Sequence, residues 1–221
     1  MVVFMCGRFC FVAEKKVIEK RLNVQVPELF QPVYNAAPGQ QLSLIANDDP
    51  AMLSSFRWGL VPYWAKSAAI GYKMINARVE TVLEKPSYSK LFISRRCLIP
   101  MTGFFEWKTI DRKKIPFLIK MKSNEIFCCA GLWDLWLDKS TGEQLKTFTI
   151  MTTEPNDLVR NIHERMPVII SKDLEFEWLT DGLKIDILQT PYTSEEMIYV
   201  EVSQLVNSPK NNNSDILLSA N

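Results

Sequence analysis

The sequence predicts an α+β fold: a single domain with a bent, barrel-like, mostly antiparallel β-sheet core flanked by short helices. Short runs rich in β-branched and aromatic residues recur along the 221-residue chain. Helical intervals interrupt them, but without the regular strand and helix alternation of a parallel doubly wound sheet. The length suits one substantial core, so we expect residues 1–221 to form one domain.

The helices are predicted from apolar spacing. Between residues 13 and 22 apolar side chains recur every three to five positions, with Lys and Glu opposite them. Shorter helical intervals are expected at residues 86–93, 155–161, 172–179 and 194–197. Proline residues and Gly39 punctuate the stretch up to Gln40, which predicts an extended loop there.

The strands are predicted from short apolar and β-branched runs. These runs lie at residues 42–46, 52–58, 96–100, 116–122, 126–132, 147–151, 168–170 and 199–202. The last stretch, residues 208–221, is rich in Asn and Ser and is expected to be a flexible tail.

Composition narrows the class of partner. Apolar residues make up 47% of the chain and charged residues 23%, as in an ordinary soluble globular protein. Lys and Arg total 26 against 25 Asp and Glu, so a nucleic-acid surface would have to be a local patch. The apolar start, residues 1–5, is too short for a secretory signal, and no run approaches the roughly 20 apolar residues that cross a bilayer. We expect a cytoplasmic protein with no membrane partner.

The cysteines indicate neither disulfides nor a metal site. There are 5 of them, unevenly spaced, with only 1 histidine in the chain. A structural zinc site needs about four nitrogen or sulfur ligands, so reduced thiols and no bound metal are expected. No Gly-rich phosphate loop or dinucleotide fingerprint is present, and no cofactor is predicted.

Four segments combine reactive side chains with an apolar frame. Each has a plain structural reading: Cys6 as a small buried hydrophobe, Asn76 as a turn former, Glu106 on the solvent face of a strand, and His163 as a surface or hydrogen-bonded structural residue. The segments are Met5-Cys6-Gly7-Arg8-Phe9, Ile75-Asn76-Ala77-Arg78-Val79-Glu80-Thr81, Gly103-Phe104-Phe105-Glu106-Trp107-Lys108 and His163-Glu164-Arg165-Met166-Pro167.

Taken together, these segments resemble the SOS response-associated peptidase (SRAP) family, also described as abasic-site processing proteins. The resemblance spans nearly the whole chain in the family's order, which makes chance agreement negligible. It also includes Tyr34-Asn35-Ala36-Ala37-Pro38-Gly39, Trp58-Gly59-Leu60-Val61-Pro62, Val202-Ser203 and Val206-Asn207.

The resemblance implies a DNA-damage (SOS) response protein that bonds covalently to abasic sites in single-stranded DNA through an amino-terminal cysteine. Such a cysteine is a 1,2-aminothiol, which condenses with the aldehyde of a ring-opened abasic sugar and closes to a thiazolidine. An α-amine has an unperturbed pKa of about 7.7 to 8.0 and a thiol one of about 8.5, so both are partly available near neutrality. The second attack is then intramolecular.

The resemblance also assigns roles to the other catalytic candidates. Asn76 matches an asparagine that holds the nucleophile or the sugar oxygen in place. Glu106 matches a general acid/base, and its aromatic neighbours could raise its pKa toward the useful range. His163 matches a histidine that assists sugar ring opening and protonates leaving groups. Glu106 and His163 could also carry protons in a lyase-like reversal of the crosslink.

The DNA-binding residues are predicted in the same way. Arg8 and Arg78 would hold phosphates beside the lesion, and Trp64 would pack against a base or the bent strand. Asn35 and Pro38 belong to the same expected DNA-binding set. The expected partner is single-stranded DNA bound by a monomer, which would be nucleoid-associated when bound.

One departure from the family pattern concerns the amino terminus. Family members carry the cysteine directly after the initiator methionine, whereas residues 1–5 precede Cys6 here. A peptide-bonded amine cannot form a Schiff base. Translation could start at Met5, the protein could cut its own Met5–Cys6 bond, or a capped protein could merely bind DNA.

Three functions therefore stay open on the sequence. The first is the crosslinker of abasic single-stranded DNA, with hydrolase or peptidase activity toward its own amino terminus. The second is a peptidase acting on other proteins, with Cys6 as thiolate, His163 as base and Asn76 as orienter. The third is a non-covalent single-stranded DNA-binding module.

Overall fold

The protein is described by a computed structural model over residues 6–219, so predictions for residues 1–5 and 220–221 lie outside the described residues. Its centre is a sheet that closes on itself. The strands run in the order β4–β3–β6–β9–β10, and β10 then pairs in parallel with β4. These strands are β3 (Gln41–Ala46), β4 (Asp49–Trp58), β6 (Arg96–Met101), β9 (Phe127–Leu137) and β10 (Gln144–Thr153).

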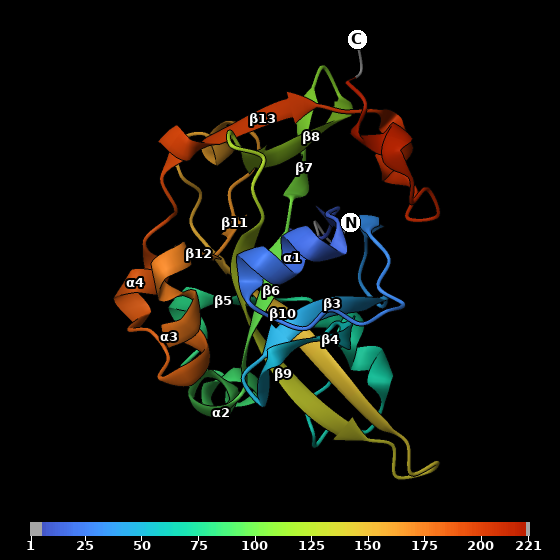
Figure 1. The fold of residues 1–221 in the computed structure, drawn as a ribbon, viewed down its shortest axis with the longest axis vertical. Coiled ribbons are helices and arrows are strands. Elements are labelled where there is room, and N and C mark those ends of the chain that lie inside the picture. Colours follow the sequence, from blue (N-terminus) through green and yellow to red (C-terminus); the bar gives the residue numbers. More distant parts are fainter. Residues whose placement is uncertain (1–5, 220–221) are drawn as a thin grey trace.

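A second, antiparallel sheet lies above this barrel in Figure 1, with strand order β13–β8–β7–β1–β2. The β7–β8 hairpin forms its middle, and β1 attaches the amino-terminal segment to β7. The strands are β1 (Phe9–Phe11), β2 (Val33–Ala36), β7 (Gly103–Ile110), β8 (Lys113–Met121) and β13 (Met197–Glu201).

Three short strands extend the barrel around β10 and β9. Where β4 ends, the chain leaves the sheet and returns as β5 (Asn76–Arg78), which continues the parallel pairing with β10. β11 (Met166–Pro167) pairs with the end of β10, and β12 (Ile169–Ile170) pairs with β9. The end of β10 therefore lies between the Asn76 and the His163 segments.

The helices are short and lie around the strands (Figure 1). They are α1 (Lys15–Leu22), α2 (Pro86–Ser94), α3 (Glu175–Thr180) and α4 (Ile185–Gln189). Short 3-10 segments cover Ala68–Lys73, Val79–Thr81, Val159–Asn161, Lys172–Leu174, Ser194–Glu196, Gln204–Asn207 and Ser214–Leu217. Within residues 6–219, no helix is both long enough and apolar enough to cross a membrane.

The apolar core explains why the barrel strands form. β6 is buried along its whole length and β9 along most of it, so both read as continuous apolar runs. Aromatic rings from three strands meet inside: the Trp58 ring lies 5.2 Å from that of Phe9 and 6.2 Å from that of Phe148. Because Phe9 is part of this core, the segment just after Cys6 is firmly fixed.

The predicted α+β class and barrel-like, mostly antiparallel sheet are confirmed. The helix expected at 13–22 is α1, and all the predicted strand runs fall on strands or their ends. The sequence missed β1, β2, β5, β7 and β11. Of these, β2 lies inside the proline-rich stretch that predicted a loop.

The carboxy-terminal segment differs from the flexible tail that the sequence predicts. The Ile216 side chain is completely buried, in a small cluster with Cys10 and Phe105. Asn212 Oδ1 accepts hydrogen bonds from two backbone amides of β2, at 2.8 and 3.0 Å. The Asn side chains that suggested disorder make these contacts.

Candidate active site

Cys6 and Glu106 meet where β1 pairs with β7. The ladder places Phe9 opposite Phe104, and the amide of Phe105 donates to the carbonyl of Arg8 at 2.9 Å. Just before β1, the backbone nitrogen of Cys6 donates to Oε1 of Glu106 at 2.7 Å. The atom that would be the amine of an amino-terminal Cys6 therefore rests on a carboxylate.

Glu106 is unusual because its carboxyl group is buried, with 2% of the residue exposed. Burial raises the pKa of Glu106 to about 7, although His163 and the hydrogen bonds from Cys6 and from the Trp107 backbone limit the rise. The solvent-face reading of Glu106 is wrong. A carboxyl group with this pKa can both accept and donate a proton near neutrality.

His163 follows the 3-10 turn Val159–Asn161 and faces Glu106. Its Nε2 lies 3.9 Å from Glu106 Oε2, and its side chain is 11% exposed. Its Nδ1 lies 3.1 Å from the amide nitrogen of Arg165 and 3.2 Å from the Arg165 carbonyl oxygen. The amide can only donate and the carbonyl can only accept, so the two contacts favour opposite neutral tautomers. The shorter one, with the amide, favours the proton on Nε2, toward Glu106. Of the two plain readings of His163, a surface residue or a hydrogen-bonded structural one, the first is wrong, while the contacts with Arg165 agree with the second.

Arg165 joins the two sides of the site. Its carbonyl oxygen lies 3.9 Å from the Cys6 Sγ, and its amide contacts His163. Its guanidinium group forms a bidentate pair with the Glu80 carboxylate, at 2.7 and 2.9 Å, and donates to the Thr152 carbonyl at 2.7 Å. The sequence assigned no catalytic role to Arg165 or Glu80, although both lie inside motifs that carry predicted catalytic residues.

The environment of the Cys6 thiol does not stabilise a thiolate. Cys6 is 2% exposed. Burial first, and then the negative charge of Glu106, raise the pKa of the Cys6 thiol well above its usual value. The backbone of Cys6 is left-handed, with φ of 45°, a conformation that costs a residue with a Cβ about 1–2 kcal/mol.

Asn76 and Arg78 lie on β5, alongside the end of β10. Asn76 lies opposite Ile150, and Arg78 lies opposite Thr152, whose carbonyl accepts a hydrogen bond from Arg165. The Oδ1 of Asn76 is shielded from solvent, whereas Arg78 is exposed. The Asn76 and His163 segments are therefore brought to one end of one strand.

Arg8 makes contacts other than those that the sequence suggested. Its Nη1 donates to Asn35 Oδ1 and to the Val206 carbonyl, both at 2.7 Å, and its Nη2 donates to the Asn207 carbonyl at 3.2 Å. Asn35 is completely buried, and its amide donates to three carbonyls of residues 206–211. In this structure Arg8 and Asn35 hold the carboxy-terminal segment in place through these hydrogen bonds. Their DNA-binding role stays a prediction.

Pro38 and Trp64 lie nearer the surface. Pro38 is half-buried and precedes Gly39, whose φ of +90° makes the turn beneath the Tyr72 ring. The Trp64 side chain is 52% exposed and lines a cavity of about 350 Å³ with Lys90, Glu84 and others. A DNA contact by either residue stays a prediction.

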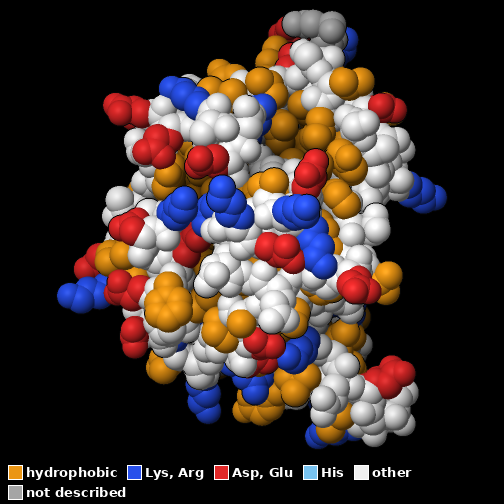
Figure 2. Space-filling model, viewed as in Figure 1, with side chains coloured by type: hydrophobic (Ala, Val, Ile, Leu, Met, Phe, Trp, Pro, Cys, Tyr) orange, Lys and Arg blue, Asp and Glu red, His pale blue; other side chains and the backbone are white. Residues whose placement is uncertain are grey.

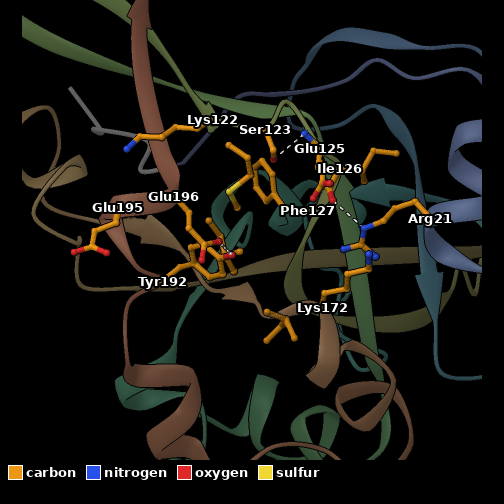
Figure 3. Close-up of a pocket in the computed structure, with 13 residues that line it drawn as sticks. Arg21, Lys122, Ser123, Glu125, Ile126, Phe127, Lys172, Tyr192, Glu195 and Glu196 are labelled. Atoms are coloured by element: carbon orange, nitrogen blue, oxygen red, sulfur yellow. Dashed lines mark hydrogen bonds between the residues drawn. The ribbon is translucent and has the colours of Figure 1, made fainter.

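A separate cavity of about 420 Å³ lies between the β8–β9 connection and the 3-10 turn Ser194–Glu196 (Figure 3). None of the predicted catalytic residues lines it. Its rim carries charges of both signs, from Arg21, Lys122 and Lys172 and from Glu125, Glu195 and Glu196. The Arg21 guanidinium forms a bidentate pair with Glu175, at 2.7 and 2.8 Å. We assign this cavity no part in the chemistry at Cys6.

The surface carries no dominant sign of charge on the face in Figure 2, where Lys and Arg alternate with Asp and Glu. This agrees with a net charge of +1. Among residues 6–219, no group of three or more His, Cys, Asp or Glu side chains is placed to hold a metal ion.

Comparison with known proteins places the chain in a family. Residues 5–209 match the family model for SOS response associated peptidase (SRAP). The abasic site processing protein YoqW of Bacillus subtilis is 47% identical over 97% of this chain and 100% of its own. The abasic site processing protein HMCES of Xenopus tropicalis is 29% identical over 83% of this chain and 64% of its own.

A solved structure shows the same fold. A protein of Bacteroides thetaiotaomicron superposes with a TM-score of 0.89 at 31% identity, over 98% of this chain and 100% of that one. The family motifs, the matching fold and the convergence of Cys6, Glu106 and His163 agree with one another. The chain belongs to the SOS response associated peptidase (SRAP) family.

Proposed function

We propose that this protein processes abasic sites in single-stranded DNA by forming a covalent crosslink through the amine and thiol of an amino-terminal Cys6. The names of relatives such as YoqW support the abasic site as substrate. The observation that carries the proposal is the 2.7 Å hydrogen bond from the Cys6 nitrogen to the buried Glu106 carboxylate. A site built for thiol chemistry alone would not need a base on that nitrogen.

The reaction begins with the amine. Glu106, with a pKa of about 7, takes a proton from the Cys6 ammonium group, whose unperturbed pKa is about 7.7 to 8.0. The free amine attacks the aldehyde carbon of the ring-opened sugar and forms a carbinolamine. The carbinolamine loses water to give the imine, and the departing hydroxyl group takes its proton from Glu106 or His163.

The thiol then completes the crosslink. The Cys6 sulfur adds to the imine carbon, its proton passes to the imine nitrogen, and a five-membered thiazolidine results with no further leaving group. Because the thiol and imine belong to one residue, the attack is intramolecular and does not need a thiolate of low pKa. The raised pKa of the Cys6 thiol is therefore compatible with this chemistry.

The other predicted residues have places in this scheme. Asn76 would orient the reacting atoms from β5, and His163 would open the sugar ring and return protons during reversal. Arg78, exposed beside the site, would hold a phosphate, and Trp64, which is half exposed, would pack against the strand. Single-stranded DNA is the proposed substrate because a flexible strand can bend over the site, and an abasic nucleotide has no base to unstack.

The amine has to be freed before any of this can occur. Translation from Met5 followed by methionine removal would free it, as would hydrolysis of the Met5–Cys6 peptide bond by the protein itself. The left-handed conformation of Cys6 favours the second route, because cleavage releases the strain on that backbone. The intact mass of the natively expressed protein, measured for wild type and for Glu106→Gln, would distinguish the routes. Glu106→Gln should block self-cleavage and leave residues 1–5 attached, whereas it should not affect translation from Met5.

The direct test mixes protein beginning at Cys6 with an oligonucleotide containing one abasic site. We expect an adduct that survives denaturation. Cys6→Ala keeps an amine but not the thiol, so its adduct should survive only after borohydride reduction of the imine. Protein that retains residue 5 should give no adduct that survives denaturation without reduction. Absence of any adduct with the Cys6-initiated protein would reject the proposal.

A peptidase acting on other proteins is less well supported. It requires a Cys6 thiolate, yet burial and Glu106 raise the pKa of that thiol, and its hydrogen bond goes to the Arg165 carbonyl. Cleavage of added peptides by protein with a blocked amine would favour it. A purely non-covalent DNA-binding module would instead give complexes that weaken with salt and dissociate fully on denaturation.

A further inference from the structure

We propose that Glu80 is a positioning residue for the crosslinking reaction: it holds Arg165, and the backbone of Arg165 orients His163 and Cys6. The effect on the crosslinking rate rests on the proposed function, whereas the effect on the position of His163 does not. Glu80 lies two residues beyond β5, on the 3-10 turn Val79–Thr81. Arg165 lies on the opposite side of β10, beside β11. The ion pair therefore links the Asn76 and His163 segments.

The contact is well suited to fixing a backbone position. The two terminal guanidinium nitrogens of Arg165 donate to the Glu80 carboxylate, at 2.7 and 2.9 Å, and the Arg165 side chain is only 9% exposed. The remaining anchor of this side chain is Thr152, through its carbonyl at 2.7 Å. Burial raises the pKa of Glu80, but the hydrogen bonds and charge of Arg165, a backbone hydrogen bond and the charge of Arg78 together keep the pKa below its usual value. A bidentate pair of this kind has defined geometry.

The backbone of Arg165 is what reaches the reacting groups. Its amide approaches His163 Nδ1 at 3.1 Å, and its carbonyl lies 3.9 Å from Cys6 Sγ. If Glu80 loses its charge, Arg165 remains a buried cation without its carboxylate, and the side chain should turn toward solvent. The 163–165 turn would then relax, and the preference of His163 for a proton on Nε2 would weaken.

A shift of the His163 ring should also change the pKa of Glu106. Two charged groups face the Glu106 carboxyl: the amine of Cys6, when it is free, and the His163 ring. Arg165 acts on Cys6 rather than on Glu106. A protonated His163 lowers the pKa of Glu106 against the effect of burial. Moving the ring away should therefore raise that pKa and shift the rise of the reaction rate to higher pH.

The structural test uses the fact that the chain has 1 histidine. Nitrogen-15 NMR of the uncrosslinked protein therefore reports the His163 tautomer without overlap. We expect wild type to hold the proton on Nε2 and Glu80→Gln to populate both neutral tautomers. The matched control, Glu84→Gln, removes an exposed acid four positions along the same segment and should leave the spectrum unchanged.

The kinetic test uses the same variants, beginning at Cys6, with the abasic oligonucleotide. For Glu80→Gln the crosslinking rate at saturating DNA should fall about 10-fold to 100-fold, and the half-saturating DNA concentration should change less than about twofold. The acidic limb of its pH–rate profile should lie at higher pH. Glu80→Asp, which retains the charge, should restore most of the rate.

The outcomes are separable. An unchanged tautomer in a folded Glu80→Gln protein overturns the inference, as does a rate that falls with an unchanged pH profile. If Glu80→Gln does not fold, Arg165→Lys keeps the positive charge but loses the bidentate pair. It should show the same changes, and wild-type behaviour of this variant in both measurements overturns the inference. Failure of the wild type itself to crosslink would reject the proposed function while leaving the NMR result to decide the role of Glu80.

Discussion

Glu106 is the residue whose protonation should control the reaction. Burial raises its pKa to about 7, and the Cys6 nitrogen donates to it. As a base it must be deprotonated, so the crosslinking rate should rise with pH up to about 7 and level off above it. Glu106→Gln should lower the rate by about 10²-fold to 10⁴-fold and remove this limb. Single-turnover adduct formation at several pH values measures both effects.

The control for that variant is a surface acid. Glu164→Gln changes the carboxylate next to His163 in sequence, but the residue is exposed. It should retain both the rate and the pH limb. A Glu106→Gln protein that crosslinks as fast as wild type would show that another group removes the proton from the Cys6 amine.

The same carboxyl group should make the native state less stable as the pH rises. The folded-state pKa of about 7 lies above the unfolded value, so the folded protein binds the extra proton more tightly. Stability is then greatest below the unfolded pKa and falls as pH rises through about 7, by an amount of order 3 kcal/mol.

Glu106→Gln should remove this loss, because glutamine cannot ionise. We expect the variant to melt at a higher temperature than wild type at pH 8, and the difference to shrink at pH 5. Thermal unfolding followed by circular dichroism at the two pH values measures this. Equal melting temperatures at pH 8 would mean that the charge of Glu106 is better stabilised than its burial suggests.

The carboxy-terminal segment is the element that fixes the outer side of the site. Asn207 accepts from the Trp107 indole at 2.7 Å, its carbonyl receives Arg8, and both partners are close in sequence to Glu106 and Cys6. The segment is held in turn by Ile216, whose side chain is completely buried.

Ile216→Ala should therefore lower the free energy of unfolding by about 2–4 kcal/mol, as expected for a fully buried isoleucine. Leu218→Ala is the matched control, because Leu218 is 60% exposed, and should change stability by less than about 0.5 kcal/mol. Urea unfolding of the three proteins measures this. Equal effects of the two substitutions would mean that the segment does not pack as it does here.

The sequence predicted the strong elements and missed those that tertiary contacts create. α1 and the barrel strands have clear periodicity or continuous apolar runs, and all were predicted, although the runs predicted for β9 and β10 were several residues too short. β1, of three residues, and β5 have too few residues to show a pattern, and they exist because they pair with β7 and β10. The Asn-rich carboxy terminus looked disordered because its asparagines bind backbone groups that no local pattern reveals.

The site followed the same rule. Cys6, Glu106 and His163 were identified from their motifs, and the structure brings them together. The Glu80–Arg165 pair was not identified, because a charged residue in a motif looks the same whether it contacts DNA or another side chain. Arg8 illustrates the converse: its motif suggested a phosphate, and its guanidinium group contacts carbonyls and Asn35.

At the scale of the whole molecule, the thiols should be inert as long as residues 1–5 remain attached. All 5 cysteines are free and buried. Burial raises the pKa of Cys10 to about 11 and that of the others well above the usual value. Thiolates are the reactive form, so the native chain should react slowly with a disulfide reagent such as Ellman's.

Unfolding should restore ordinary reactivity, because an exposed cysteine has a pKa of about 8.5. In the folded protein that keeps residues 1–5, we expect fewer than one thiol per chain to react with the reagent within minutes at pH 8. In denaturant all 5 thiols should react. Cys6→Ala should leave the native time course unchanged and lower the final count by one. A fast native phase that Cys6→Ala abolishes would mean that Cys6 is an activated thiol even with its amine blocked, and would revive the peptidase alternative. A slow native reaction leaves the amine as the group on which reactivity toward an aldehyde depends.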